Sequence, residues 1–207
     1  LLHMVACTSA PTTETPPTPQ PTQPVIGVLT RENVAQIAVQ NEFTVDTDLQ
    51  IYAYSPDGQF VILGTPTTNA GFTLFNTNRT TGETIQTYTG HTDLVLGVDY
   101  SPDETRIVSS SMDRTIRIWD VQTGEQVMLF DKHTDQISSV EYHPSGKWIA
   151  SCDFAGKVLV WDANTGEIAH EQTFYRGDFT TDVTSLAFSP DGNFLAIGTI
   201  GIALNIW

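Results

Sequence analysis

The sequence has little of three things that often reveal function: cysteine, basic residues and long apolar runs. Its 207 residues include two cysteines, Cys7 and Cys152, whose settings differ too much for a disulfide framework. With 24 acidic residues against 9 basic ones, the net charge is −15, which disfavours binding to nucleic acid. No run of 18 apolar residues occurs, so no transmembrane helix is expected.

Patterns for catalysis and for metal binding are also missing. The five histidines are scattered without a shared ligand spacing, and no glycine-rich phosphate loop is present. The Asp-Gly pairs form turns more readily than they bind calcium. We therefore expect no catalytic, cofactor-binding or metal-binding residues, and no cofactor. Cys152 is expected to be a small buried side chain.

The first residues predict a membrane anchor. Val5-Ala6-Cys7 ends an apolar stretch, and a tract rich in Pro and Thr follows, which predicts an extended tether. This pattern resembles the end of a bacterial lipoprotein signal peptide, in which the cysteine becomes the lipidated first residue of the mature protein. Met4 stands where that pattern usually has Leu. The resemblance implies lipidation at Cys7 and a place in the cell envelope, on the outer face of a bacterial membrane. An ordinary truncated signal peptide is the alternative.

A repeat of 42 to 46 residues runs through the rest of the chain. Each copy has a Pro-containing turn, followed by an aromatic residue that closes a short apolar run. The prolines are Pro56, Pro102, Pro144 and Pro190, and the aromatic residues are Phe75, Trp119, Trp161 and Trp207. In the second copy, four short runs rich in β-branched and aromatic residues are separated by turn residues, which predicts a four-stranded meander. Repetition at this length indicates one supersecondary unit copied side by side.

The pairs Gly90-His91, Trp119-Asp120 and Trp161-Asp162, with Ser-Pro-Asp-Gly turns between them, resemble WD repeats. The resemblance implies an all-β fold: a WD-repeat β-propeller with about four blades, the first degenerate and the last incomplete. The chain is then expected to be a fragment of a larger closed propeller and, alone, to form an open arc. The expected organisation is a signal-peptide remnant at 1–7, a tether at 8–24, a lead-in segment at 25–43, and blades in 44–207, divided as 44–89, 90–131, 132–175 and 176–207.

The resemblance also implies structural residues. In WD repeats a His, a strand Ser or Thr, a turn Asp and the Trp form a hydrogen-bonded chain within a blade. The second copy supplies His91, Ser109 or Ser111, Asp113 and Trp119. At the position of the turn Asp, the third copy has Ala155 and the fourth has Gly201, and Phe75 replaces the Trp in the first copy. These three copies are therefore expected to lack the complete chain and to depend on apolar packing.

Binding is expected on the loops, because loops on a rigid scaffold usually carry it. The candidate partner-binding residues on one face are Leu94, Met112, Arg114, Gln136 and Phe154. Exposed Met and Phe side chains there are candidate contact anchors, and packing against neighbouring loops is the alternative. The leading hypothesis is a non-catalytic protein-interaction scaffold with an unidentified protein partner, touching the membrane only through the lipid anchor. One alternative is the substrate-positioning part of a larger enzyme, and another is an envelope structural protein without a specific partner.

Overall fold

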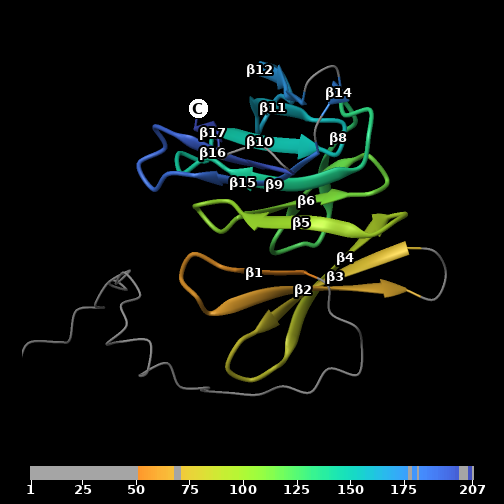
Figure 1. Cartoon of the computed structure of the whole chain (residues 1–207). Helices are drawn as coiled ribbons and strands as arrows, with labels where there is room; N and C mark the ends of the chain where they lie inside the picture. Colours follow the sequence, from red (N-terminus) through yellow and green to blue (C-terminus); the bar gives the residue numbers. More distant parts are fainter. Residues whose placement is uncertain (1–50, 68–70, 177–178, 181, 201–204, 207) are drawn as a thin grey trace, which may run out of the picture. The chain divides into compact units, whose positions relative to one another are not determined.

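The computed structural model describes residues 51–67, 71–176, 179–180, 182–200 and 205–206 (Figure 1). Every regular element in these ranges is a β-strand, and the described residues contain no helix. The all-β expectation is therefore confirmed. The predicted signal-peptide remnant, tether and lead-in segment lie outside the described residues, and Cys7 lies there with them.

The first two copies of the repeat each form an antiparallel four-stranded sheet with strands in chain order. The first sheet contains β1 (Ile51–Tyr54), β2 (Phe60–Thr67), β3 (Gly71–Asn78) and β4 (Thr84–His91). The second contains β5 (Val95–Tyr100), β6 (Arg106–Ser111), β7 (Ile116–Asp120) and β8 (Gln126–Phe130). These are the meanders that the spacing of turn residues predicts.

The third and fourth copies follow the same order. The third sheet contains β9 (Ile137–Tyr142), β10 (Trp148–Asp153), β11 (Lys157–Asp162) and β12 (Ile168–Thr173). The fourth contains β15 (Val183–Phe188), β16 (Leu195–Thr199) and β17 (Asn205–Ile206). A two-stranded hairpin, β13 (Tyr175–Arg176) with β14 (Phe179–Thr180), lies between them in the chain.

The sheets follow one another through their first strands. β1 contacts β5, β5 contacts β9, and β9 contacts β15. Figure 1 shows β1, β5 and β9 one above another, each at the edge of its own sheet. Consecutive copies of the repeat are therefore neighbours in space as well as in sequence.

The core lies between neighbouring sheets, and β6 and β10 each bury both of their faces. On β6, Ile107 packs into the cluster shared with the first sheet, and the next residue, Val108, packs into the cluster shared with the third. On β10, Ile149 packs into the cluster shared with the second sheet, and Ala150 packs into the cluster shared with the fourth. Successive strand residues point to opposite faces, so a strand buried on both sides needs a continuous apolar run.

The Pro-containing turns are fixed by their serines. In the second copy Ser101 Oγ donates to Asp103 Oδ1 at 2.6 Å and accepts from Arg106 N at 2.9 Å. The corresponding bonds recur in the first and fourth copies at Ser55 and Ser189. A serine hydroxyl that donates to the Asp and accepts from the backbone closes the turn locally, which explains why these residues recur with the repeat.

Candidate functional site

A buried hydrogen-bonded network joins four residues of the second copy. Trp119 Nε1 donates to Ser109 Oγ at 2.9 Å, and Ser109 Oγ lies 2.8 Å from His91 Nε2. His91 Nδ1 lies 2.9 Å from Asp113 Oδ2. Ser111 is not part of this chain, since its Oγ donates to Asp93 O and accepts from Asp113 N.

The chemistry of these groups gives the network one direction. An ionised carboxylate only accepts hydrogen bonds, so His91 Nδ1 carries the proton and donates to Asp113. Nε2 of the neutral imidazole then accepts from the Ser109 hydroxyl, which in turn accepts from the Trp119 indole. Burial opposes ionisation of Asp113, but hydrogen bonds from His91, Thr115 and the backbone N–H of Thr92 hold its pKa below the ordinary value.

The third copy has the same network, and the expectation that it lacks an acidic member is wrong. His133 Nδ1 lies 2.8 Å from Asp153 Oδ2, and His133 Nε2 lies 2.8 Å from Ser151 Oγ, which accepts from Trp161 Nε1 at 3.2 Å. The carboxylate comes from the last residue of β10 instead of the following turn, where Ala155 stands. The side chain of Asp153 is fully buried.

The network of the second copy joins two neighbouring sheets, whereas the sequence resemblance placed the chain within one blade. His91 ends β4 of the first sheet, and its partners belong to the second. In the third copy, His133 lies in the loop between β8 and β9 instead of in a strand. Aromatic contacts also join neighbouring sheets. The ring centroids of Tyr88 on β4 and Trp119 are 5.9 Å apart, and Phe130 of β8 stacks on Trp161 with the centroids 4.2 Å apart. Polar and apolar contacts together therefore attach the last strand of one sheet to the next sheet.

The other two copies differ. In the first sheet, Phe75 stands in β3 without an indole donor, as the sequence predicts. Gly201 and Trp207 of the fourth copy lie outside the described residues.

The predicted binding loops meet through one recurring backbone contact. Met112 N donates to Leu94 O at 2.8 Å, and Phe154 N donates to Gln136 O at 3.1 Å. Ile200 N donates to Asp182 O at 3.0 Å in the fourth copy. In each case the loop before the sheet's first strand is held against the turn between its second and third strands. These paired loops, which we call the loop face, keep one backbone geometry while their side chains vary.

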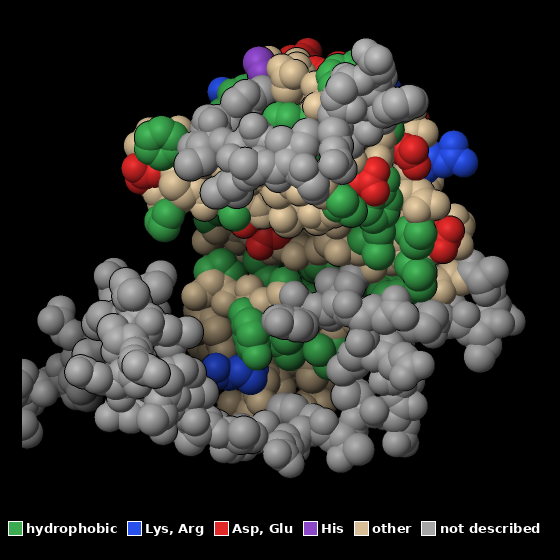
Figure 2. All heavy atoms as spheres, in the orientation of Figure 1, with side chains coloured by type: hydrophobic (Ala, Val, Ile, Leu, Met, Phe, Trp, Pro, Cys, Tyr) green, Lys and Arg blue, Asp and Glu red, His purple; other side chains and the backbone are tan. Residues whose placement is uncertain are grey.

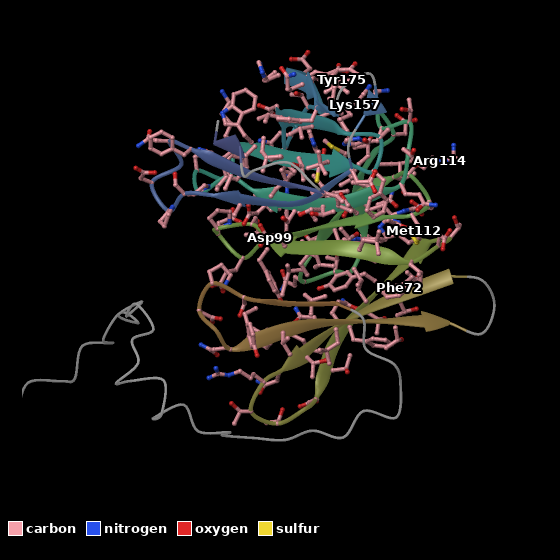
Figure 3. The ribbon with its side chains drawn as sticks, in the orientation of Figure 1. Phe72, Asp99, Met112, Arg114, Lys157 and Tyr175 are labelled. Atoms are coloured by element: carbon pink, nitrogen blue, oxygen red, sulfur yellow. The ribbon has the colours of Figure 1, made fainter. Side chains whose placement is uncertain are left out.

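The loop-face side chains are less exposed than expected. Arg114 is exposed, with a positive φ of 67°, but Leu94, Met112, Gln136 and Phe154 are half-buried. Leu94 packs against the core cluster between the first two sheets. Figure 3 shows Met112 and Arg114 at the opposite end of the strands from Asp99. Met112 and Phe154 are therefore partly exposed, and their role as contact anchors stays a prediction.

The groups that could resemble a catalytic site are used internally. Ser109 Oγ is engaged by both His91 and Trp119, so it offers no free nucleophile. Within the described ranges no group of three or more His, Cys, Asp or Glu residues could hold a metal ion. Cys152 is buried, and burial raises the pKa of its thiol to about 12, which disfavours the reactive thiolate.

Sequence reasoning missed two acidic residues on the first strands. Asp99 Oδ1 accepts from Tyr100 N and its Oδ2 accepts from Tyr142 N of the next sheet, both at 2.8 Å. Glu141 stands at the same position one copy later and accepts from Phe188 N at 2.7 Å. Burial raises the pKa of Asp99 to about 6 and that of Glu141 to about 7. Their shared position, two residues before the turn, was a signal in the sequence.

The surface carries the acidic excess as separate side chains. Figure 2 shows acidic groups distributed over the visible face, with apolar groups between them. No helix among the described residues is long and apolar enough to cross a membrane.

A fold of successive four-stranded meanders joined by His, Ser, Asp and Trp networks defines a class of protein, the propeller-type repeat proteins. The family "WD domain, G-beta repeat" (WD40) matches residues 82–120, 124–162 and 170–202, which together make up more than half of the chain. The chain therefore belongs to the WD40 repeat family. Its first two matched segments run from the last strand of one sheet through the third strand of the next, so each includes its complete network.

Three curated relatives match over short stretches. The chain is 58% identical over 40 residues to the uncharacterized WD repeat-containing protein sll1491 of Synechocystis, covering 19% of this chain and 12% of the relative. It is 40% identical over 70 residues to Autophagy-related protein 16 of Arabidopsis thaliana, covering 33% and 13%. It is 56% identical over 34 residues to the transcriptional repressor tup12 of Schizosaccharomyces pombe, covering 16% and 6%. The chain therefore spans a small part of each relative.

Proposed function

We propose that this chain is a non-catalytic protein-interaction scaffold that is tethered to a bacterial cell surface through a lipid on Cys7. WD repeats generally mediate protein interactions, and their family is typically non-catalytic. The matched relatives bear names from unrelated processes, which favours a shared binding architecture over a shared reaction. The partner proposed here is a protein.

The observation that carries this proposal is the repeated backbone contact of the loop face. The same contact recurs from Met112 to Leu94, from Phe154 to Gln136 and from Ile200 to Asp182. Fixed loops present their side chains without a large loss of loop entropy on binding, which favours recognition. Among the side chains named above, Arg114 is the exposed one, and arginine is common at protein interfaces.

A pull-down from cell membranes with the full chain tests the scaffold function. Arg114→Glu reverses the exposed charge of the loop face, and Lys147→Glu reverses an exposed charge in the turn between β9 and β10. We expect the wild type and Lys147→Glu to retain the same protein and Arg114→Glu to lose at least about tenfold of it. Equal retention by both variants would contradict the loop face as the binding surface.

The anchor is tested separately by labelling with a clickable fatty acid. We expect the wild-type protein to be labelled and to fractionate with membranes, and Cys7→Ser to lose both properties. Unlabelled, soluble wild-type protein would contradict the anchor but leave the scaffold proposal standing.

A further inference from the structure

A cavity of about 240 Å³ lies between the second and third sheets at the Pro-containing turns, away from the loop face. It is lined by the turn before β6, the turn before β10 and the turn after β11. Its lining includes Arg106, Tyr142, Gly146, Ala163 and Asn164. Arg106 Nη1 donates to Asn164 Oδ1 at 2.9 Å across the cavity's rim.

Among the described residues, the Pro-containing turns at this junction lack the hydrogen bond that joins them at the other two. Between the first and second sheets, Glu104 reaches across and accepts from Asp57 N at 2.7 Å. Between the third and fourth, His143 Nε2 lies 2.9 Å from Gly192 O. At the middle junction Gly146 takes the position of Glu104, and a Cβ there would only touch Pro102 at 3.7 Å. Ala163, where the preceding copy has the larger Val121, leaves further space.

The lining of this cavity also departs from the repeat. The position five residues after the first turn residue is aromatic in three copies, as Phe60, Trp148 and Phe194, but is Arg106 in the second. Arg106 makes no ion pair among the described residues. Arg106 faces Asp120 across the strands and interacts with its charge. Packing alone does not explain a cation in place of an aromatic side chain.

A donor without a partner lies beside Arg106 on the cavity lining. Tyr142 is 5% exposed, and its hydroxyl has no hydrogen-bond partner among the described residues. The equivalent Tyr100 of the preceding copy donates to Asn76 Oδ1 at 3.0 Å. Burial raises the pKa of Tyr142, so its hydroxyl keeps the proton and remains a donor. Buried polar groups are nearly always paired, so an unpaired one beside a cavity points to a missing acceptor.

We propose that this cavity binds a carboxylate group, with Arg106 as the charged donor and the Tyr142 hydroxyl as the second donor. Its volume lies below the range of cavities that take drug-sized ligands, which favours a single side chain or a small carboxylic acid. Guanidinium and hydroxyl donors suit a carboxylate, whose oxygens accept several hydrogen bonds. Asp103 on the lining accepts from Ser101 and Thr105 at its Oδ1, and these hydrogen bonds hold its pKa below the ordinary value, so Arg106 must offset this charge as well as bind the ligand. Most of the acidic residues behind the net charge of −15 are not on the cavity lining, and salt screens their repulsion of a bound carboxylate.

NMR titration of the full chain with N-acetyl-glutamate α-methylamide, whose one carboxylate is that of the side chain, tests the proposal. We expect saturable shifts of the Gly146 and Asn164 amides, and binding at least about tenfold weaker for the capped glutamine analogue. Arg106→Phe, which restores the aromatic residue of the other copies, should weaken binding at least about tenfold. Tyr142→Phe should weaken it by about threefold to tenfold. No saturable shift, or equal binding of glutamate and glutamine probes, overturns the proposal.

Two further variants separate cavity binding from general effects on folding. Gly146→Glu places at the middle junction the residue that Glu104 supplies at the first, with a similar φ of 71° against 61°, and should abolish binding while the chain remains folded. Glu104→Gly opens the first junction without supplying a cation and should leave binding unchanged. Retained binding in Gly146→Glu overturns the proposal. Propionate and a peptide with a free carboxyl terminus, titrated in parallel, distinguish a small acid from a protein side chain or chain end as the source.

Discussion

Asp113 and Asp153 bond the same nitrogen of their histidines from positions that differ by two residues in the repeat. Asp113 lies six residues before Trp119, in the turn after β6, and Asp153 lies eight residues before Trp161, at the end of β10. Their distances to His Nδ1 are nevertheless 2.9 Å and 2.8 Å. The network therefore requires a carboxylate near the end of the second strand but tolerates two ways of supplying it.

The first prediction concerns these two carboxylates. Asp153→Ala should destabilise the chain more than Asp113→Ala, by about 3 kcal/mol against about 1–2 kcal/mol, because Asp153 is fully buried and leaves a buried His N–H unpaired. Urea denaturation measures both. The exposed Asp131→Ala is the control and should change little. Equal, negligible effects of both substitutions would show that the networks contribute nothing to stability.

The second prediction separates two neighbouring serines on β6. Ser109→Ala should cost about 1–3 kcal/mol, because Trp119 Nε1 and His91 Nε2 both lose their partner. Ser110 is equally buried, but its hydroxyl has no partner, so Ser110→Ala should be neutral or stabilising. Thermal unfolding of the two variants gives the comparison. The same loss for both would mean that the cost comes from packing and not from the network.

The third prediction concerns pH. Burial raises the pKa of Glu141 to about 7, against a hydrogen bond from Phe188 N and with the nearby Asp99 charge adding to the rise. The native state therefore holds this proton more tightly than the unfolded chain, so the associated stability is present below about pH 4.5 and is lost as the pH rises to about 7. The loss should be on the order of 1–2 kcal/mol, less than the full shift because the group is partly exposed.

Glu141→Gln checks this sign, because its Oε1 can still accept from Phe188 N without burying a charge. We expect a flatter stability profile than the wild type between pH 4.5 and 7, and higher stability at pH 7. The exposed Glu167→Gln serves as the control and should follow the wild-type profile. Parallel profiles for Glu141→Gln and the wild type would contradict the argument.

The fourth prediction concerns the close approach of β5 and β9. A Cβ on Gly97 would lie 2.7 Å from Ser110 Oγ and 3.0 Å from the backbone nitrogen of Val140 on the neighbouring sheet. Gly97→Ala should therefore cost about 2–3 kcal/mol, because a backbone must move. Gly58→Ala meets nothing within 4 Å and should cost only the strain of its positive φ of 68°, about 1 kcal/mol. Calorimetry of both variants tests the order, and a larger loss for Gly58→Ala would contradict it.

Much of the fold could be predicted from the sequence, because the repeat spacing and local turn chemistry determine it. The prolines recur in all four copies, the turn serines in three and the Trp-Asp pairs in two. The network of the second copy could be predicted for the same reason, since each of its members stands at a regular position in the repeat. Asp153 was missed because a fixed position for the acidic residue was assumed, although Ser151 ten residues before Trp161 pointed to the network.

The rest depends on contacts between copies, which one copy's pattern does not contain. Met112 and Phe154 are half-buried because each turn bonds to the loop before its own sheet. The cavity at the middle junction requires Gly146 and Arg106 to be read against their equivalents in the neighbouring copies. Comparison of the copies, position by position, would have found Arg106 from the sequence alone.

Residue-specific photocrosslinking in cells that make the full chain tests the proposed scaffold function most directly. A photoreactive residue in place of Arg114 on the loop face is compared with one in place of Lys147, in the turn between β9 and β10. The proposed function predicts one discrete crosslinked protein at position 114, competed away by excess wild-type chain, and none at position 147. No crosslink at position 114, or the same adducts at both positions, would contradict it.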